Sequence, residues 1–176
     1  DMLISSGGGG TNTAATFAKQ GFKTAFCGKV GDDLAGREIV EELKKLKIDT
    51  SFVSKTSARA TNTSVVLTSL NLDRTILTYR GASELLCKTD IPWRRLKTKW
   101  FYLAPLSGML CNITKELVEF AYKNSIKIAL NPGNSQLALP RENLKSVIKK
   151  TDILILNQEE ASLLTGISYQ REAKIF

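Results

Sequence analysis

The sequence contains no histidine among its 176 residues. Histidine is the commonest general base and a member of Ser-His-Asp and Cys-His sites, so these nucleophilic mechanisms are excluded. The three cysteines, Cys27, Cys87 and Cys111, are odd in number, widely spaced and without a CxxC pair. A zinc site is therefore not expected, and the cysteines are interpreted as buried, reduced thiols. Any catalysis must use carboxylates, lysine or a partner segment.

The sequence also lacks a long hydrophobic run. Its longest apolar stretches, such as "DILILN" and "IKIALN", have the length of a strand. The N-terminus has neither the basic start nor the apolar stretch of a secretory signal. We therefore expect a cytoplasmic protein with no membrane partner.

A cluster of basic and aromatic residues of the kind that binds RNA is absent as well. The 25 Lys and Arg residues outnumber the 17 Asp and Glu residues, which gives a formal charge of +8. The positive residues are spread over helical faces among acidic neighbours, as in "EELKKLK". This distribution favours a solvated surface, and no nucleic-acid partner is expected.

Short β-rich runs alternate with longer amphipathic segments along the chain. This alternation predicts an α/β fold in which a mostly parallel sheet is flanked by helices. The four expected core strands are nearly continuously hydrophobic, which predicts burial on both faces. They are residues 23–30, 99–105, 126–132 and 152–157.

Three helices are expected from apolar residues at helical spacing. Asp32 or Asp33 is the predicted N-cap of the first helix. The second covers residues 114–124, and the third follows Pro140. Their predicted buried faces are Ile39, Val40, Leu43 and Leu46; Leu117, Val118 and Ala121; and Leu144, Val147 and Ile148.

Residues 61–82 interrupt the alternation. Two β-rich runs are joined at "NLDR" with no helix between them, which predicts an antiparallel hairpin. It is either an edge hairpin of the main sheet or a small separate sheet that covers a site as a lid. Its free edges could pair with a second subunit, so a homodimer is one expected partner arrangement.

The glycine run Gly7–Gly10 leads into an alanine-rich segment that Gly21 is expected to end. Glycines let a backbone approach a ligand closely, and the first N–H groups of the following helix are unpaired. Asn12 adds an amide suited to a hydroxyl-rich ligand. A flexible linker is the alternative. The spacing disfavours a dinucleotide-binding turn, and no Gly-Lys-Ser/Thr follows for a P-loop.

Two segments of the chain resemble signatures of the ribokinase-type (PfkB) carbohydrate kinases. The first is "GGGGTNTAATFAKQGFKTAFCGKVGDDLAGREI", and the second is "LILNQEEASLLTG", which is similar to the Asn-x-x-Glu segment of the family. Together they span nearly the whole chain. The matching residues are Gly7, Gly8, Asn12, Gly21, Gly31, Asp32, Asp33, Gly36, Asn157 and Glu160.

The resemblance implies transfer of the γ-phosphoryl group of ATP, with Mg²⁺, to a hydroxyl of a sugar or sugar-like substrate. It implies sugar contacts from Gly7, Gly8, Gly9, Gly10 and Asn12, and the hairpin becomes the substrate lid. Arg80, at the end of that hairpin, is either a further substrate contact or an ordinary exposed arginine. For the Mg²⁺-bound phosphates, the implied residues are Asn157 and Glu160, with Asn131 a weaker candidate. No direct metal ligand is expected.

The sequence departs from the family pattern at two places. Where ribokinase has a glutamate, "YLAPLSG" offers Ser107, so ribose is not favoured over other sugars. The Gly-Ala-Gly-Asp segment, which supplies an anion hole and the catalytic base, does not occur before Phe176. We therefore expect residues 1–176 to form one partial domain that is incomplete at both ends and has its base downstream.

The same residues leave one alternative function open and disfavour another. A kinase-like module that has lost catalysis and binds a sugar or a partner remains the alternative. A Rossmann-type oxidoreductase is disfavoured by the glycine spacing.

Overall fold

The computed structural model describes residues 3–68 and 74–168. The chain divides between Pro92 and Trp93 into two compact units, called unit 1 and unit 2 below. In these described ranges no helix is both long and apolar enough to cross a membrane.

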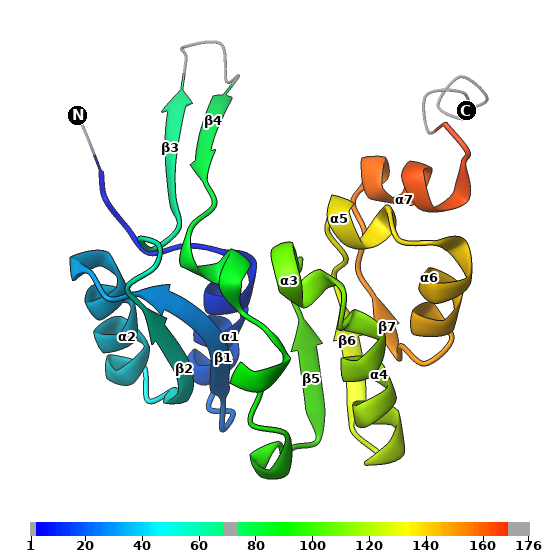
Figure 1. Ribbon diagram of the computed structural model, residues 1–176, viewed down its shortest axis with the longest axis horizontal. Coiled ribbons are helices and arrows are strands. Elements are labelled where there is room, and N and C mark those ends of the chain that lie inside the picture. The colour runs from blue at the N-terminus through cyan, green and yellow to red at the C-terminus, as the bar shows by residue number, and fades with distance from the viewer. Residues whose placement is uncertain (1–2, 69–73, 169–176) are drawn as a thin grey trace. The chain divides into compact units, whose positions relative to one another are not determined.

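Unit 1 contains two small sheets with helices beside them (Figure 1). Strands β1 and β2 pair in parallel, and β3 and β4 form a second, antiparallel pair. Ala14, Leu43 and Ile48 form a buried cluster that joins the two helices to the chain before β2. The elements are α1 (Gly9–Lys19), β1 (Ala25–Gly31), α2 (Leu34–Lys45), β2 (Asp49–Thr56), β3 (Thr63–Thr68), β4 (Arg74–Tyr79), η1 (Ala82–Leu85) and η2 (Lys88–Asp90).

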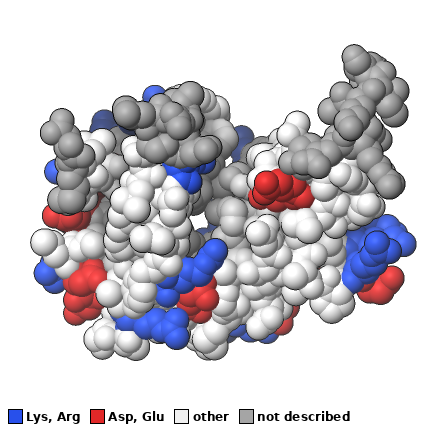
Figure 2. Space-filling model, turned by 90° about the horizontal axis from the view of Figure 1, so that it is seen from above, with Lys and Arg blue, Asp and Glu red and all other residues white. Residues whose placement is uncertain are grey.

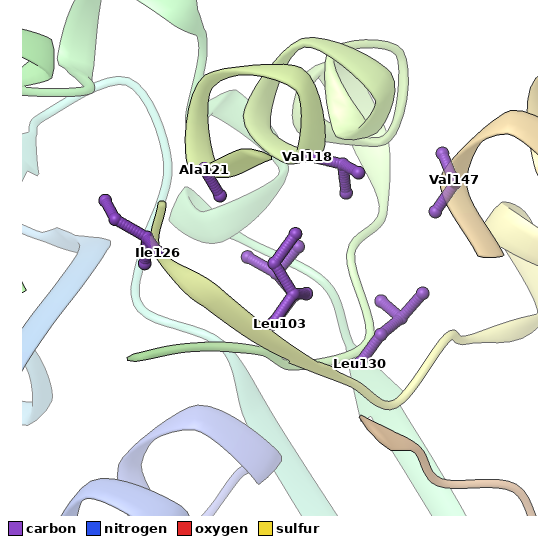
Figure 3. Close-up of a cluster of buried hydrophobic side chains, with 7 residues drawn as sticks. Leu103, Val118, Ala121, Ile126, Leu130 and Val147 are labelled. Atoms are coloured by element: carbon purple, nitrogen blue, oxygen red, sulfur yellow. The ribbon is translucent and has the colours of Figure 1, made fainter. Parts of the chain in front are cut away.

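Unit 2 is built on a parallel sheet with the strand order β5-β6-β7. Its core joins the sheet to α4 and α6, and Figure 3 shows Leu103, Leu130, Val118 and Val147 in this cluster. The elements are η3 (Trp93–Arg95), β5 (Trp100–Leu103), α3 (Gly108–Cys111), α4 (Thr114–Lys123), β6 (Lys127–Leu130), α5 (Asn134–Leu137), α6 (Arg141–Ile148), β7 (Ile153–Leu154) and α7 (Gln158–Thr165).

The predicted helices α2, α4 and α6 are confirmed. Of the two capping candidates, Asp33 is the N-cap of α2, because its side chain accepts a hydrogen bond from Gly36 N–H at 2.8 Å. Val40 and Leu43 are buried on α2, and the predicted faces of α4 and α6 contribute Val118, Ala121 and Val147 to the core of unit 2. Periodicity therefore identified the packed side of each helix correctly.

The predicted strands are confirmed, but their uniform burial is wrong. Leu154 of β7 packs against the core, whereas Ile153 and Ile155 are 48% and 44% exposed. Successive side chains of a strand point to opposite faces of the sheet, so Leu154 lies on the face that the core covers and its two neighbours lie on the other face. Strand β2 was not expected, because its sequence is largely polar and shows no hydrophobic run.

The predicted hairpin is confirmed as a separate two-stranded sheet rather than an edge of the main sheet. In Figure 1, β3 and β4 extend away from α1, α2, β1 and β2. All twelve residues of the two strands are exposed. The predicted turn at 71–74 lies outside the described residues except for Arg74, which begins β4.

The three cysteines are free thiols, but only Cys111 is fully buried. Burial, with a smaller contribution from the negative charge of Asp90, raises the pKa of Cys27 to about 11. Asp90 forms an ion pair with Lys29 at 2.7 Å, and Lys29 also donates to the Leu85 carbonyl. These contacts fix η1 and η2 to β1.

Charged side chains of both signs are distributed over the surface. On the face drawn in Figure 2, Lys and Arg lie in small groups with Asp and Glu beside several of them. In unit 2 an ion pair between Lys150 and Glu119 joins the end of α6 to α4. This ion pair connects two neighbouring helices, and the basic residues on the face drawn in Figure 2 do not form one continuous surface.

Candidate functional site

The glycine-rich segment forms the start of α1. The helix begins at Gly9, so Gly7 and Gly8 alone precede it and the other two glycines lie in its first turn. Thr11, which the sequence analysis did not single out, fixes this turn by donating its hydroxyl to Gly7 O at 2.8 Å. The N-cap Gly8 provides no side-chain cap, so the first N–H groups of α1 are left to other partners.

Asn12 lies one turn into α1, and its backbone N–H closes the first helical hydrogen bond to Gly8 O at 3.0 Å. Its side chain is exposed. It lines an open pocket of about 280 Å³ between α1 and α2, together with Ser6, Lys19 and Glu42. The amide is therefore accessible to a ligand from solvent.

Arg80 follows directly after β4, at the base of the hairpin. Its side chain is 64% exposed and lies 3.8 Å from the Glu84 carboxylate. The guanidinium is thus accessible, and Glu84 already balances part of its charge.

The Gly-Asp-Asp segment after β1 forms a compact hydrogen-bonded corner. Asp33 accepts from Thr61 N–H and from the Thr61 hydroxyl, both at 2.7 Å, as well as from Gly36 N–H. Hydrogen bonds from the Thr61 hydroxyl, from its backbone and then from Gly36 hold the pKa of Asp33 below its usual value. A Cβ on Gly36 would collide with the Gly31 carbonyl, so this corner requires glycine there.

The Asn-x-x-Glu segment forms a reciprocal capping box at the start of α7. The Asn157 side chain accepts from Glu160 N–H at 2.8 Å, and the Glu160 carboxylate accepts from Asn157 N–H at 2.9 Å. Both side chains therefore stabilise the helix start, and the carboxylate is held close to the positive end of the helix dipole.

The structure brings Asn131 to the same place. Its side-chain amide donates to the Ile155 carbonyl at 3.0 Å and lies 3.5 Å from Glu160 Oε2. Asn131 follows β6, and Asn157 and Glu160 follow β7. The three predicted phosphate-side residues thus meet at the carboxyl ends of two adjacent parallel strands, where open α/β sheets bind ligands.

Gln136 is a buried residue beside this site that the sequence analysis missed. Its side chain is 1% exposed, and its oxygen accepts from Leu106 N–H at 2.8 Å and from Gly133 N–H at 3.0 Å. It therefore connects the loop after β5 to the loop after β6. The run "GNSQL" carries no apolar periodicity that would have marked it, since its role is polar and depends on the fold.

The predicted site residues therefore form two groups. The glycines, Asn12 and Arg80 belong to unit 1, and the amide and carboxylate cluster of Asn131, Asn157 and Glu160 belongs to unit 2. Within the second group direct contacts are present. The roles of both groups in ligand binding stay predictions.

Comparison with known proteins identifies relatives of the whole chain. Residues 2–175 match the family model described as pfkB family carbohydrate kinase. A ribokinase from Staphylococcus aureus is 30% identical over 168 residues, and a deoxyribokinase from Salmonella typhi is 28% identical over 165 residues. The matches cover 94% and 93% of this chain and 53% of each relative. The chain thus spans about half the length of these relatives.

A solved structure shares the fold. The crystal structure of fructokinase with bound ATP from Xylella fastidiosa superposes with a TM-score of 0.74 at 19% sequence identity. The match covers 90% of this chain and 54% of the fructokinase chain. It shows a ribokinase-like α/β fold for this sequence.

Proposed function

Because the chain belongs to the pfkB family of carbohydrate kinases, we propose that it supplies the sugar-binding and phosphate-binding residues for ATP-dependent phosphorylation of a sugar hydroxyl. The observation that carries this proposal is the cluster of Asn131, Asn157 and Glu160 at the ends of β6 and β7. Phosphoryl transfer requires mainly positioning and charge stabilisation, and this cluster holds one carboxylate in a defined place.

On the sugar side, the start of α1 presents backbone N–H groups and the exposed Asn12 amide. Amides donate and accept hydrogen bonds, so Asn12 suits a substrate rich in hydroxyl groups. Arg80 at the base of the lid is proposed as a contact to a polar part of the substrate. Its partial pairing with Glu84 leaves it suited to a hydroxyl or carbonyl group more than to a second full negative charge.

On the phosphate side, the residues fit a hydrated Mg²⁺ bound to ATP. Mg²⁺ prefers oxygen ligands and keeps several waters, and it is held in many kinases by one or two carboxylates together with substrate phosphates. Within residues 3–68 and 74–168, the Glu160 carboxylate accepts its two hydrogen bonds through Oε2. ATP supplies the phosphoryl group when bound, and Glu160 and the two asparagines would orient the water shell of its Mg²⁺.

The catalytic base is proposed to come from outside these residues. No Gly-Ala-Gly-Asp sequence occurs in the 176 residues, and the sequence lacks histidine as a substitute. The chain alone is therefore expected to bind ligands but to transfer little or no phosphate. The exposed edges of the hairpin β3–β4 are further proposed to pair with a second copy.

A coupled ADP-release assay tests the placement of the base. The 176-residue chain is incubated with MgATP and, in turn, ribose, 2-deoxyribose and fructose. We expect no sugar-dependent ADP release. Measurable turnover that depends on one sugar would contradict the placement of the base outside the chain.

A charge-neutralising substitution tests the phosphate side. Glu160→Gln keeps an oxygen acceptor for Asn157 N–H, so α7 should keep its start, while the negative charge is removed. We expect affinity for MgATP, measured by calorimetry, to fall about tenfold or more, as for residues around a metal. The control is Glu159→Gln, the same change at the exposed neighbour in the same helical turn. Equal affinities of the two variants would contradict the assignment of Glu160.

A further inference from the structure

The hairpin β3–β4 has little packing of its own. All residues of both strands are exposed, including Val65, Leu67 and Leu77 at 51%, 55% and 58%. A two-stranded hairpin without a packed face is marginally stable in water. Contacts at the base of the hairpin must therefore set the direction in which it extends from the rest of unit 1.

The first strand is fixed at Thr61, two residues before β3. Thr61 is 5% exposed, and its hydroxyl accepts from Gly31 N–H at 2.9 Å while donating to Asp33 at 2.7 Å. The Thr61 backbone N–H also donates to Asp33 at 2.7 Å. One buried threonine is thus bound both to the end of β1 and to the N-cap of α2.

The second strand is fixed by the adjacent residue, Asn62. Its side-chain oxygen accepts from Gly81 N–H and Ser83 N–H, both at 3.1 Å, and its side-chain nitrogen donates to the Ser83 hydroxyl at 2.6 Å. Ala82 N–H donates to Ala60 O at 2.8 Å. A Cβ on Gly81 would collide with the same Ala60 carbonyl, so the two chain segments touch backbone to backbone.

These contacts form a continuous path from α2 through Asp33, Thr61 and Asn62 to the residues that follow β4. We propose that Thr61 and Asn62 are positioning residues, which fix the orientation of the lid hairpin relative to α1 and α2 and thereby control sugar affinity. This inference rests on the proposed function, since it treats the hairpin as the cover of a sugar site beside α1. It adds a role for two residues that need not touch the substrate.

Residual dipolar couplings of the ¹⁵N-labelled chain measure the orientation directly. In the wild type, couplings of amides in β3 and β4 should fit the alignment tensor obtained from α1, α2 and β1. Thr61→Val removes the hydroxyl that Gly31 and Asp33 share, and Asn62→Ala removes the contacts to residues 81 and 83. In both variants the couplings of the hairpin should shrink or require a different alignment tensor, while the couplings of α1 and α2 should still fit one tensor.

Two further variants distinguish the loss of the contacts at the base of the hairpin from the loss of a hydroxyl group in general. Thr61→Ser keeps the hydroxyl and should restore the wild-type couplings. Thr75→Val makes the same chemical change as Thr61→Val on an exposed residue of β4 that pairs with Leu67, away from the base, and should leave the orientation unchanged. If Thr61→Val disturbs the fold of unit 1, Asn62→Ala still tests the proposal, because its contacts lie only between the two hairpin ends.

Sugar affinity is measured on the same samples by titration with ribose, 2-deoxyribose and fructose. Thr61→Val and Asn62→Ala should bind the preferred sugar about tenfold more weakly, and Thr61→Ser should bind it as the wild type does. Unchanged couplings in both variants, or changed couplings with unchanged affinity, would overturn the proposal. A wild type that binds none of the three sugars would instead contradict the proposed function. The couplings would still show whether Thr61 and Asn62 fix the orientation of the hairpin.

Discussion

At the scale of single residues, Asp33 joins a role that the sequence shows with a role that it does not show. It was predicted as one of two candidate helix caps and matches the family signature, and the structure adds its contacts to Thr61. Thr61 is 28 residues away in the sequence, and nothing in the local pattern connects the two. Caps are predictable because they act on the next turn, whereas a contact of this kind depends on the tertiary fold.

The acid sensitivity of unit 1 follows from Asp33. Because its pKa is lower in the folded chain than in the unfolded chain, the ionised carboxylate stabilises the fold above about pH 4, the ordinary value for Asp. This stabilisation is lost as the pH falls through the folded value. Asp33→Asn should lower the free energy of unfolding by about 1–3 kcal/mol at pH 7 and flatten its decline in acid.

Urea unfolding at several pH values between 7 and 2, followed by amide signals of unit 1, measures both effects. Asp32→Asn, the same change at the exposed neighbour, should alter stability by no more than about 0.5 kcal/mol. A variant at Asp33 that keeps the full acid dependence of the wild type would refute this role for its carboxylate.

At the scale of elements, the regular parts of the chain were readable from the sequence. The helices α2, α4 and α6 lie where apolar periodicity placed them, and the strands β1, β5 and β6 lie where the hydrophobic runs placed them. What could not be read is how the loops after the strands are held. Gln136 connects two of these loops through hydrogen bonds to backbone N–H groups, and a glutamine in a polar run carries no signal of burial.

Gln136→Leu should destabilise unit 2 by about 2–4 kcal/mol, because two partly buried N–H groups lose their acceptor. The matched control is Ser135→Ala at the exposed neighbouring position. Chemical denaturation followed by amide signals of β5 and β6 gives the two values. Equal stabilities would show that Leu106 and Gly133 find other partners and that the loops do not depend on Gln136.

At the scale of the whole molecule, the family, the fold and the hairpin were predicted from two short signatures and the strand pattern, and the comparisons confirm the family over residues 2–175. The predicted phosphate-side residues are brought together in unit 2. The identity of the sugar could not be predicted, since selectivity depends on a few contacts made in three dimensions. Relatives with different substrates, such as ribokinase and deoxyribokinase, match this chain almost equally well.

The central claim is that unit 1 carries a sugar site at the start of α1. Titration of the ¹⁵N-labelled chain with ribose, 2-deoxyribose and fructose, followed by amide chemical shifts, tests it most directly. We predict saturable shifts at Gly8, Gly9, Gly10 and Asn12 with at least one sugar, and their loss in Asn12→Ala. A well-dispersed spectrum of the folded chain in which no sugar shifts these signals would contradict the account.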